Sequence, residues 1–166
     1  MKTLVLGLGN PVASDDRVGL LVARRLKPLL ADRSDVEVDE DYWGGIRLME
    51  RLVGYTRAVI VDAIVTGGPP GTIHRLAPHS IPTQHSASAH DVNLPTALKF
   101  GRQAGVALPP DDAITLIGVE AEDVLTISEE CTPAVLAAVP EAIREVLRAL
   151  ELDEKAGERP ADALEA

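Results

Sequence analysis

Four side chains in this sequence have the types and positions needed to bind a cation or move a proton. Asp15 and Asp16 follow a glycine-rich turn, Asp62 lies inside an apolar run, and His90 closes a long polar segment. An ionised carboxylate among apolar residues is costly to bury unless it is paired, hydrogen-bonded or bound to a metal. Asp62 is therefore predicted either to serve metal binding or catalysis, or to accept backbone N–H groups of a neighbouring loop. Two carboxylates and one imidazole suit a borderline or hard divalent ion with open positions for a substrate.

The acid pair has a second interpretation. Acids that precede a helix cap its free N–H groups and interact favourably with its dipole. We expect one of Asp15 and Asp16 to act as such a cap, which leaves the other as a candidate ligand. The spacing alone leaves open which of the two is the ligand.

The other reactive side chains point to no second chemistry. His74, His79 and His85 lie in an expected edge strand or a polar loop and are predicted to be solvated. Cys131 is flanked by acids that would raise the pKa of its thiol, so we interpret it as structural. Segment 7–12 lacks the third glycine of a dinucleotide-binding fingerprint and leads into acids, which disfavours a bound pyrophosphate.

Strands that alternate with helices are expected to position these groups. Apolar or alternating runs predict strands at residues 3–8, 35–39, 57–65, 72–76 and 113–119. Helical periodicity or capping signals predict helices from 17 to about 27, over 46–53, from 93 or 95 to 103, and from 133 to 150. Pro28 is expected to end or kink the first helix near Lys27, Thr132 to cap the last one, and Pro140 to bend it.

This alternation predicts a single α/β domain over residues 1–150. We expect a mostly parallel, twisted sheet of about five strands with helices on both faces, a three-layer αβα arrangement of the phosphorylase/hydrolase-like kind. In such sheets ligands bind beyond the carboxyl ends of the strands, where Asp16, Asp62 and His90 would meet. Residues 151–166 are acidic, lack apolar periodicity and are expected to form a disordered tail.

Composition narrows the possible functions. The 166 residues carry a formal net charge of -10, which disfavours nucleic-acid binding because that depends on neutralising phosphates. No apolar run approaches the ~20 residues of a membrane span, and the N-terminus lacks a signal-peptide pattern. We therefore expect a cytoplasmic protein. The single cysteine excludes an internal disulfide and a thiolate metal cluster.

Several motifs in order resemble the nickel–iron hydrogenase maturation endopeptidases, which process the hydrogenase large subunit. They are GLGN at 7–10, DD at 15–16 with Gly19 beyond, VDA at 61–63, SAHD at 88–91, IGVE at 117–120 and ISEECTPAV at 127–135. The resemblance covers residues 2 to about 148. Arg17 departs from it, because the family commonly has glycine there, and Asp16 can be glutamate in relatives.

The resemblance implies an endopeptidase that removes a C-terminal extension from the large-subunit precursor once nickel is in place. It also implies that Asp16, Asp62 and His90 hold the metal and are the catalytic residues. The nickel would come with the precursor, although another divalent cation could occupy the isolated enzyme. Activity should then decline as His90 is protonated below about pH 6.5. The expected partner is the precursor alone, with no nucleic acid and no membrane, and the enzyme is expected to be a monomer.

Three other functions stay open at this point. The chain could be a non-catalytic checkpoint that docks the nickel centre without cutting, or a nucleotide-binding regulator. A peptidyl-tRNA hydrolase-like enzyme also begins with a Gly-x-Gly-Asn-Pro segment, but the histidine–asparagine pair expected soon afterwards is missing. Arg17 could form a salt bridge with an acid of the site or contact the substrate.

Overall fold

A five-stranded sheet between two pairs of helices forms the molecule, and a computed structural model describes it over residues 1–80 and 93–150. The strands are β1 (Thr3–Leu8), β2 (Val36–Asp41), β3 (Arg57–Ile64), β4 (Ile73–Leu76) and β5 (Ile114–Glu120). The α-helices are α1 (Val18–Leu29), α2 (Gly45–Arg51), α3 (Leu94–Gln103) and α4 (Pro133–Ala149), and the 3-10 turns are η1 (Ser14–Arg17), η2 (Pro78–Ser80) and η3 (Asp111–Ala113).

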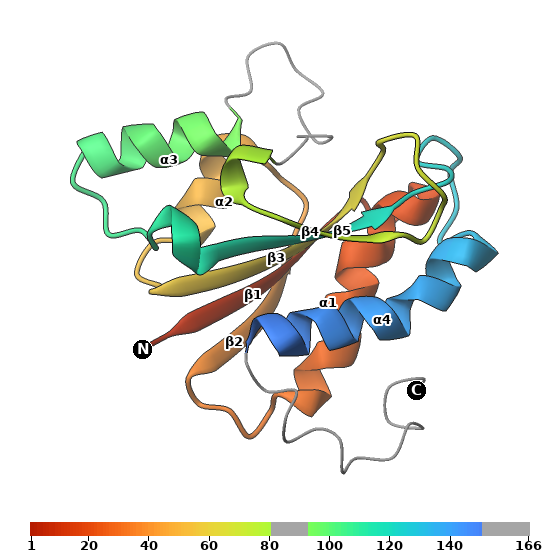
Figure 1. Cartoon of the computed structure of the whole chain (residues 1–166), viewed down its shortest axis with the longest axis horizontal. Coiled ribbons are helices and arrows are strands. Elements are labelled where there is room, and N and C mark those ends of the chain that lie inside the picture. Colours follow the sequence, from red (N-terminus) through yellow and green to blue (C-terminus); the bar gives the residue numbers. More distant parts are fainter. Residues whose placement is uncertain (81–92, 151–166) are drawn as a thin grey trace.

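The strands lie in the order β2-β1-β3-β5-β4, and only β4 runs antiparallel to its neighbour. Helices α1 and α4 cover one face of this sheet, and α2 and α3 cover the other (Figure 1). The predicted α/β fold with a mostly parallel sheet of five strands is thus confirmed. The position of β4 at the edge is confirmed as well.

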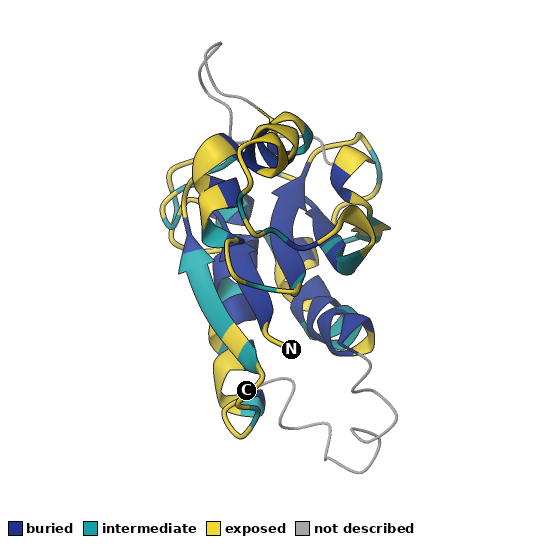
Figure 2. Cartoon of the chain, turned by 90° about the vertical axis from the view of Figure 1, so that its left-hand side faces the viewer, coloured by how far each residue is buried: buried dark blue, intermediate teal, exposed yellow. Residues whose placement is uncertain are grey.

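Each face of the sheet has its own apolar layer because successive strand residues point to opposite sides. Val59, Val61 and Ala63 of β3 face α1 and α4, whereas Ala58, Ile60 and Ile64 belong to the layer under α2 and α3. Strand β1 is buried throughout and β3 from its second residue onward, while the edge strand β2 is only partly covered (Figure 2). By this alternation Asp62 stands on the α2–α3 face. No helix of the described segments is long and apolar enough to cross a bilayer.

Two local details differ from the expectations. Pro28 does not end α1 near Lys27, because the helix continues to Leu29, and the alternative of a kink there stays a prediction. A proline in the last turn removes only one backbone hydrogen bond, which the packed apolar face of α1 tolerates. Thr132 occupies the N-cap position of α4, but its side chain does not cap that helix. Its hydroxyl donates to Asp15 instead, at 3.0 Å from Oδ1.

Helix α1 approaches the carboxyl ends of the central strands closely, and a glycine permits this. A Cβ atom built on Gly19 would lie 2.2 Å from the carbonyl oxygen of Leu8 and 2.3 Å from that of Val61. Any side chain here would push α1 away from β1 and β3. Since Val61 directly precedes Asp62, this contact brings the first turn of α1 against the backbone next to Asp62, whose side chain stands on the opposite face.

Candidate functional site at the carboxyl edge of the sheet

The loop between β1 and α1 is tied to a segment more than a hundred residues away. Ala13 forms an isolated parallel β-bridge with Ser128, in which Ser128 N–H donates to Val12 O at 3.0 Å and Ser14 N–H donates to Ser128 O at 3.1 Å. Ser14 has a φ of 45°, a left-handed conformation that is uncommon outside glycine. The surrounding contacts therefore impose the shape of the loop that carries Asp15 and Asp16.

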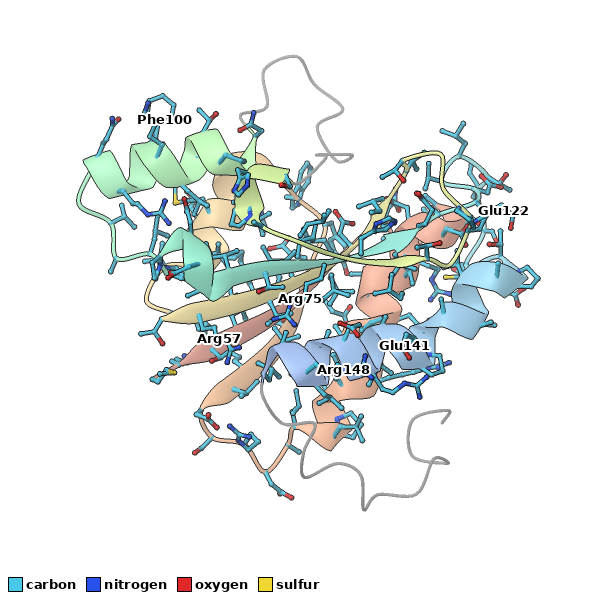
Figure 3. The ribbon with its side chains drawn as sticks, in the orientation of Figure 1. Arg57, Arg75, Phe100, Glu122, Glu141 and Arg148 are labelled. Atoms are coloured by element: carbon cyan, nitrogen blue, oxygen red, sulfur yellow. The ribbon has the colours of Figure 1, made fainter. Side chains whose placement is uncertain are left out.

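Asp15 is fully buried and serves as a structural acceptor. Its Oδ2 accepts the N–H groups of Glu122 and Asp123, both at 2.9 Å, and its Oδ1 accepts the N–H of Thr132 at 2.7 Å. One of the two acids was expected to cap the helix that follows it, but no side chain caps α1. Asp15 instead holds the β5–α4 loop, which is marked by Glu122 in Figure 3, and the N-cap residue of α4.

Asp16 is the member of the pair that keeps partial exposure. Its backbone lies against the end of β1, because Asn10 N–H donates to its carbonyl oxygen at 3.2 Å. A Cβ atom on Gly9 would lie only 2.2 Å from the same oxygen, so glycine is required for this approach. The glycine-rich turn therefore sets Asp16 directly beyond the carboxyl end of β1.

Asp62 lies at the same edge, on the neighbouring strand. It is 5 % exposed, and β1 and β3 pair in parallel with Gly7 opposite Val61, so one residue further Leu8 lies opposite Asp62. The contact of Gly19 with Val61 and the approach of Gly9 to Asp16 place both acids around one strand end. The backbones of Asp16 and Asp62 thus lie at one edge of the sheet, while a shared role of their carboxylates stays a prediction.

The third predicted ligand, His90, lies outside the described residues. Within residues 1–80 and 93–150 no group of three His, Cys, Asp or Glu side chains could hold a metal ion. A three-ligand site built on Asp16 and Asp62 therefore needs a ligand from outside those residues. The oxygen donors present fit a divalent cation, and an imidazole would extend the set to nickel or zinc. The combined site of Asp16, Asp62 and His90 stays a prediction.

A further buried carboxylate at this edge, Glu120 at the end of β5, was not predicted from the residues themselves. It is 1 % exposed, its Oε2 accepts the Thr66 N–H at 2.8 Å, and its Oε1 accepts the Gly68 N–H at 3.0 Å and the Thr66 hydroxyl. Burial acts to raise the pKa of Glu120, but these hydrogen bonds outweigh it and hold the pKa below its usual value. Glu120 thus fixes the segment that follows β3, and with it the carboxyl end of the Asp62 strand.

His74 was expected to be solvated, yet its Nε2 is buried without a hydrogen-bond partner, 3.9 Å from Glu120 Oε1. Edge strand β4 places it there, because His74 lies opposite Gly118 of β5.

Arg17 belongs to the α4 side of this edge. Its Nε is buried without a hydrogen-bond partner, and its positive charge acts on the thiol of Cys131. The ion pairs formed among the described residues leave Arg17 out, so the salt bridge considered from the sequence is not observed.

Cys131 behaves as the sequence predicts. Burial, followed by the negative charge of Asp15, raises the pKa of its thiol to about 11. At pH 8 its thiolate fraction is then about 100-fold below that of an ordinary cysteine, so alkylation by iodoacetamide should be slowed by about that factor. Mass spectrometry of the native and the urea-unfolded protein measures this difference. Equal rates in the two states would contradict a buried, structural role.

Comparisons with known proteins agree with this architecture. A sequence profile described as hydrogenase maturation protease matches residues 21–149. The hydrogenase 2 maturation protease of Escherichia coli K12 is 30% identical over 153 residues, which is 90% of this chain and 91% of that protein.

Solved structures show the same relationship. The hydrogenase maturating endopeptidase HybD from E. coli superposes with a TM-score of 0.73 at 29% identity, covering 91% of this chain and 93% of that one. The [NiFe] hydrogenase maturation protease HycI from Thermococcus kodakarensis gives 0.64 at 25% identity and 92% coverage of each chain. By sequence and by fold, this chain belongs to the hydrogenase maturation protease family.

Proposed function

We propose that this protein is an endopeptidase that removes the C-terminal extension of a nickel–iron hydrogenase large-subunit precursor after nickel insertion. The observation that carries the proposal is the placement of Asp16 and Asp62 around one strand end, in a chain that matches the maturation protease family over most of its length. The enzyme acts as a monomer in the cytoplasm, and its partner is the precursor.

In this proposal nickel is part of the substrate. Asp16, Asp62 and His90 hold the ion that the precursor carries, and this orients the cleavage site over the carboxyl edge of the sheet. An ion bound there supplies Lewis-acid polarisation of the scissile carbonyl or of a water molecule. The described chain offers no activated thiolate at this edge, because Cys131 is half-buried with a raised pKa. Recognition then depends on ligands from both proteins, which makes cleavage conditional on nickel insertion.

Incubation with a nickel-loaded precursor tests this directly. We expect mass spectrometry to show loss of a C-terminal peptide, with no change in the nickel-free precursor. Treating the enzyme alone with a chelator that is then removed should leave cleavage unchanged, because the ion arrives with the substrate. His90→Ala should lose activity. Binding of the precursor without any change in its mass would contradict the peptidase and indicate a non-catalytic checkpoint.

A further inference from the structure

An exposed group of large side chains follows β2 at the same edge of the sheet. Tyr42 is 52% exposed, Trp43 57% and Ile46 49%. We call these three residues the aromatic platform. The whole sequence holds only one tryptophan, two tyrosines and one phenylalanine, so half of its aromatic residues are exposed here. Exposed, clustered aromatic side chains are typical of the energetic centre of a protein interface.

The platform has a fixed base. The carboxylate of Asp41 is buried and accepts the N–H of Tyr42 at 2.7 Å. From α2, the Nε atoms of Arg47 and Arg51 both lie 3.7 Å from this carboxylate. The guanidinium of Arg47 also lies 5.8 Å from the centre of the Trp43 ring, within the range of a cation–π contact. A base held in this way lowers the ordering cost of binding.

The platform adjoins the two acids of the candidate site. Gly9 N–H donates to Asp41 O at 3.2 Å, and the same glycine lies against the backbone of Asp16. Strand β1 separates Asp41 from Asp62, with Leu8 opposite Asp41. Two strand spacings amount to about 10 Å, and an extended chain covers that distance in about three residues. A polypeptide bound at the two acids would therefore reach the platform within about four residues.

Charge separates the platform from an exposed apolar pair in the β5–α4 loop at this edge. Leu125 and Ile127 are 89% and 87% exposed, but they lie in the β5–α4 loop, which is rich in acids. At the platform, Arg47 lies against the carboxylate of Asp41, and Arg51 forms ion pairs with both Asp39 and Asp41. The acids beside the platform are therefore held in ion pairs with α2, which makes the platform the better surface for apolar side chains.

We infer that the aromatic platform docks apolar side chains of the precursor within a few residues of its scissile bond. The inference rests on the proposed function. Docking to a preformed surface stabilises the bound substrate and the transition state equally, so its loss should raise KM and leave kcat unchanged. Trp43 is the residue with the largest contribution, because it offers the largest exposed ring.

The test compares Trp43→Ala and Trp43→Phe with Phe100→Ala as a matched control. Phe100 is 58% exposed, yet it projects from the side of α3 turned away from the sheet (Figure 3). Steady-state cleavage of the nickel-loaded precursor should show KM raised about 10-fold or more in Trp43→Ala, with kcat within about twofold of wild type. Trp43→Phe should restore most of the loss, and Phe100→Ala should match wild type. Circular dichroism should show the same fold in all of them.

Two outcomes would overturn the inference. In one, Trp43→Ala and Phe100→Ala have the same KM; in the other, Trp43→Ala lowers kcat at unchanged KM. Either result would leave the proposed function standing if wild type cleaves the precursor. Failure of wild type to cleave it would instead reject the proposed function.

Discussion

Asp62→Asn is expected to reduce cleavage of the nickel-loaded precursor at least about 100-fold, while the protein stays folded. Asparagine has nearly the same shape as aspartate, but its neutral oxygen is a much weaker ligand for a divalent ion. The position is 5 % exposed and lies near the loop that carries Asp16, so a water molecule has little room to enter and replace the lost ligand. Single-turnover cleavage followed by mass spectrometry measures the effect.

The matched control is Asp112→Asn, which makes the same chemical change on the exposed turn before β5, at the opposite edge of the sheet. It should cleave like wild type. Asp16→Asn should share the defect of Asp62→Asn, because both carboxylates are proposed to hold the same ion. Near-normal turnover by Asp62→Asn would remove this residue from the mechanism.

Asp15→Ala is expected to lower the free energy of unfolding by about 3 to 5 kcal/mol. The substitution removes the carboxylate that accepts several buried hydrogen bonds, so their donors are left without a partner. The N–H groups of Glu122, Asp123 and Thr132 would lose their acceptor, and so would the Thr132 hydroxyl. Urea denaturation measures the loss.

The neighbouring acid provides the contrast for this measurement. Asp16→Ala should change stability by less than about 1 kcal/mol, since a half-buried side chain away from the core tolerates truncation, yet it should abolish cleavage. The two adjacent aspartates would then have different roles, a structural one for Asp15 and a chemical one for Asp16. Equal stability of Asp15→Ala and wild type would show that the β5–α4 loop does not depend on this carboxylate.

The sequence predicted the sheet because its inner strands are continuous apolar runs. Residues 57–65 and 113–119 could only be buried on both faces, and this required helices on either side. The alternating segment at 35–39 correctly indicated an edge strand, although β2 runs two residues further, to Asp41. The strand continues there because its backbone stays paired with β1, with Gly7 opposite Glu40 and Leu8 opposite Asp41.

The roles of individual acids were harder to predict, because their partners are remote in the sequence. Asp15 and Asp16 are adjacent and chemically identical, and only the segment around Glu122 and Thr132 distinguishes them. Thr132 looked like an N-cap because that pattern is local, whereas its actual acceptor lies 117 residues earlier. Glu120 ends an apolar strand in the same way that Asp62 interrupts one. This shared pattern of a carboxylate in an apolar run could have identified Glu120 from the sequence.

The bond between the β1–α1 loop and Ser128 has a consequence for biosynthesis. The loop that carries Asp16 is shaped by hydrogen bonds to residues 123, 128 and 132, so a nascent chain that still lacks them has no formed loop there. Nearly the whole domain must leave the ribosome before the loop that carries Asp16 is in place. During its synthesis the protein is therefore expected to bind neither its substrate nor a free metal ion. It should become able to bind them only after the domain is complete.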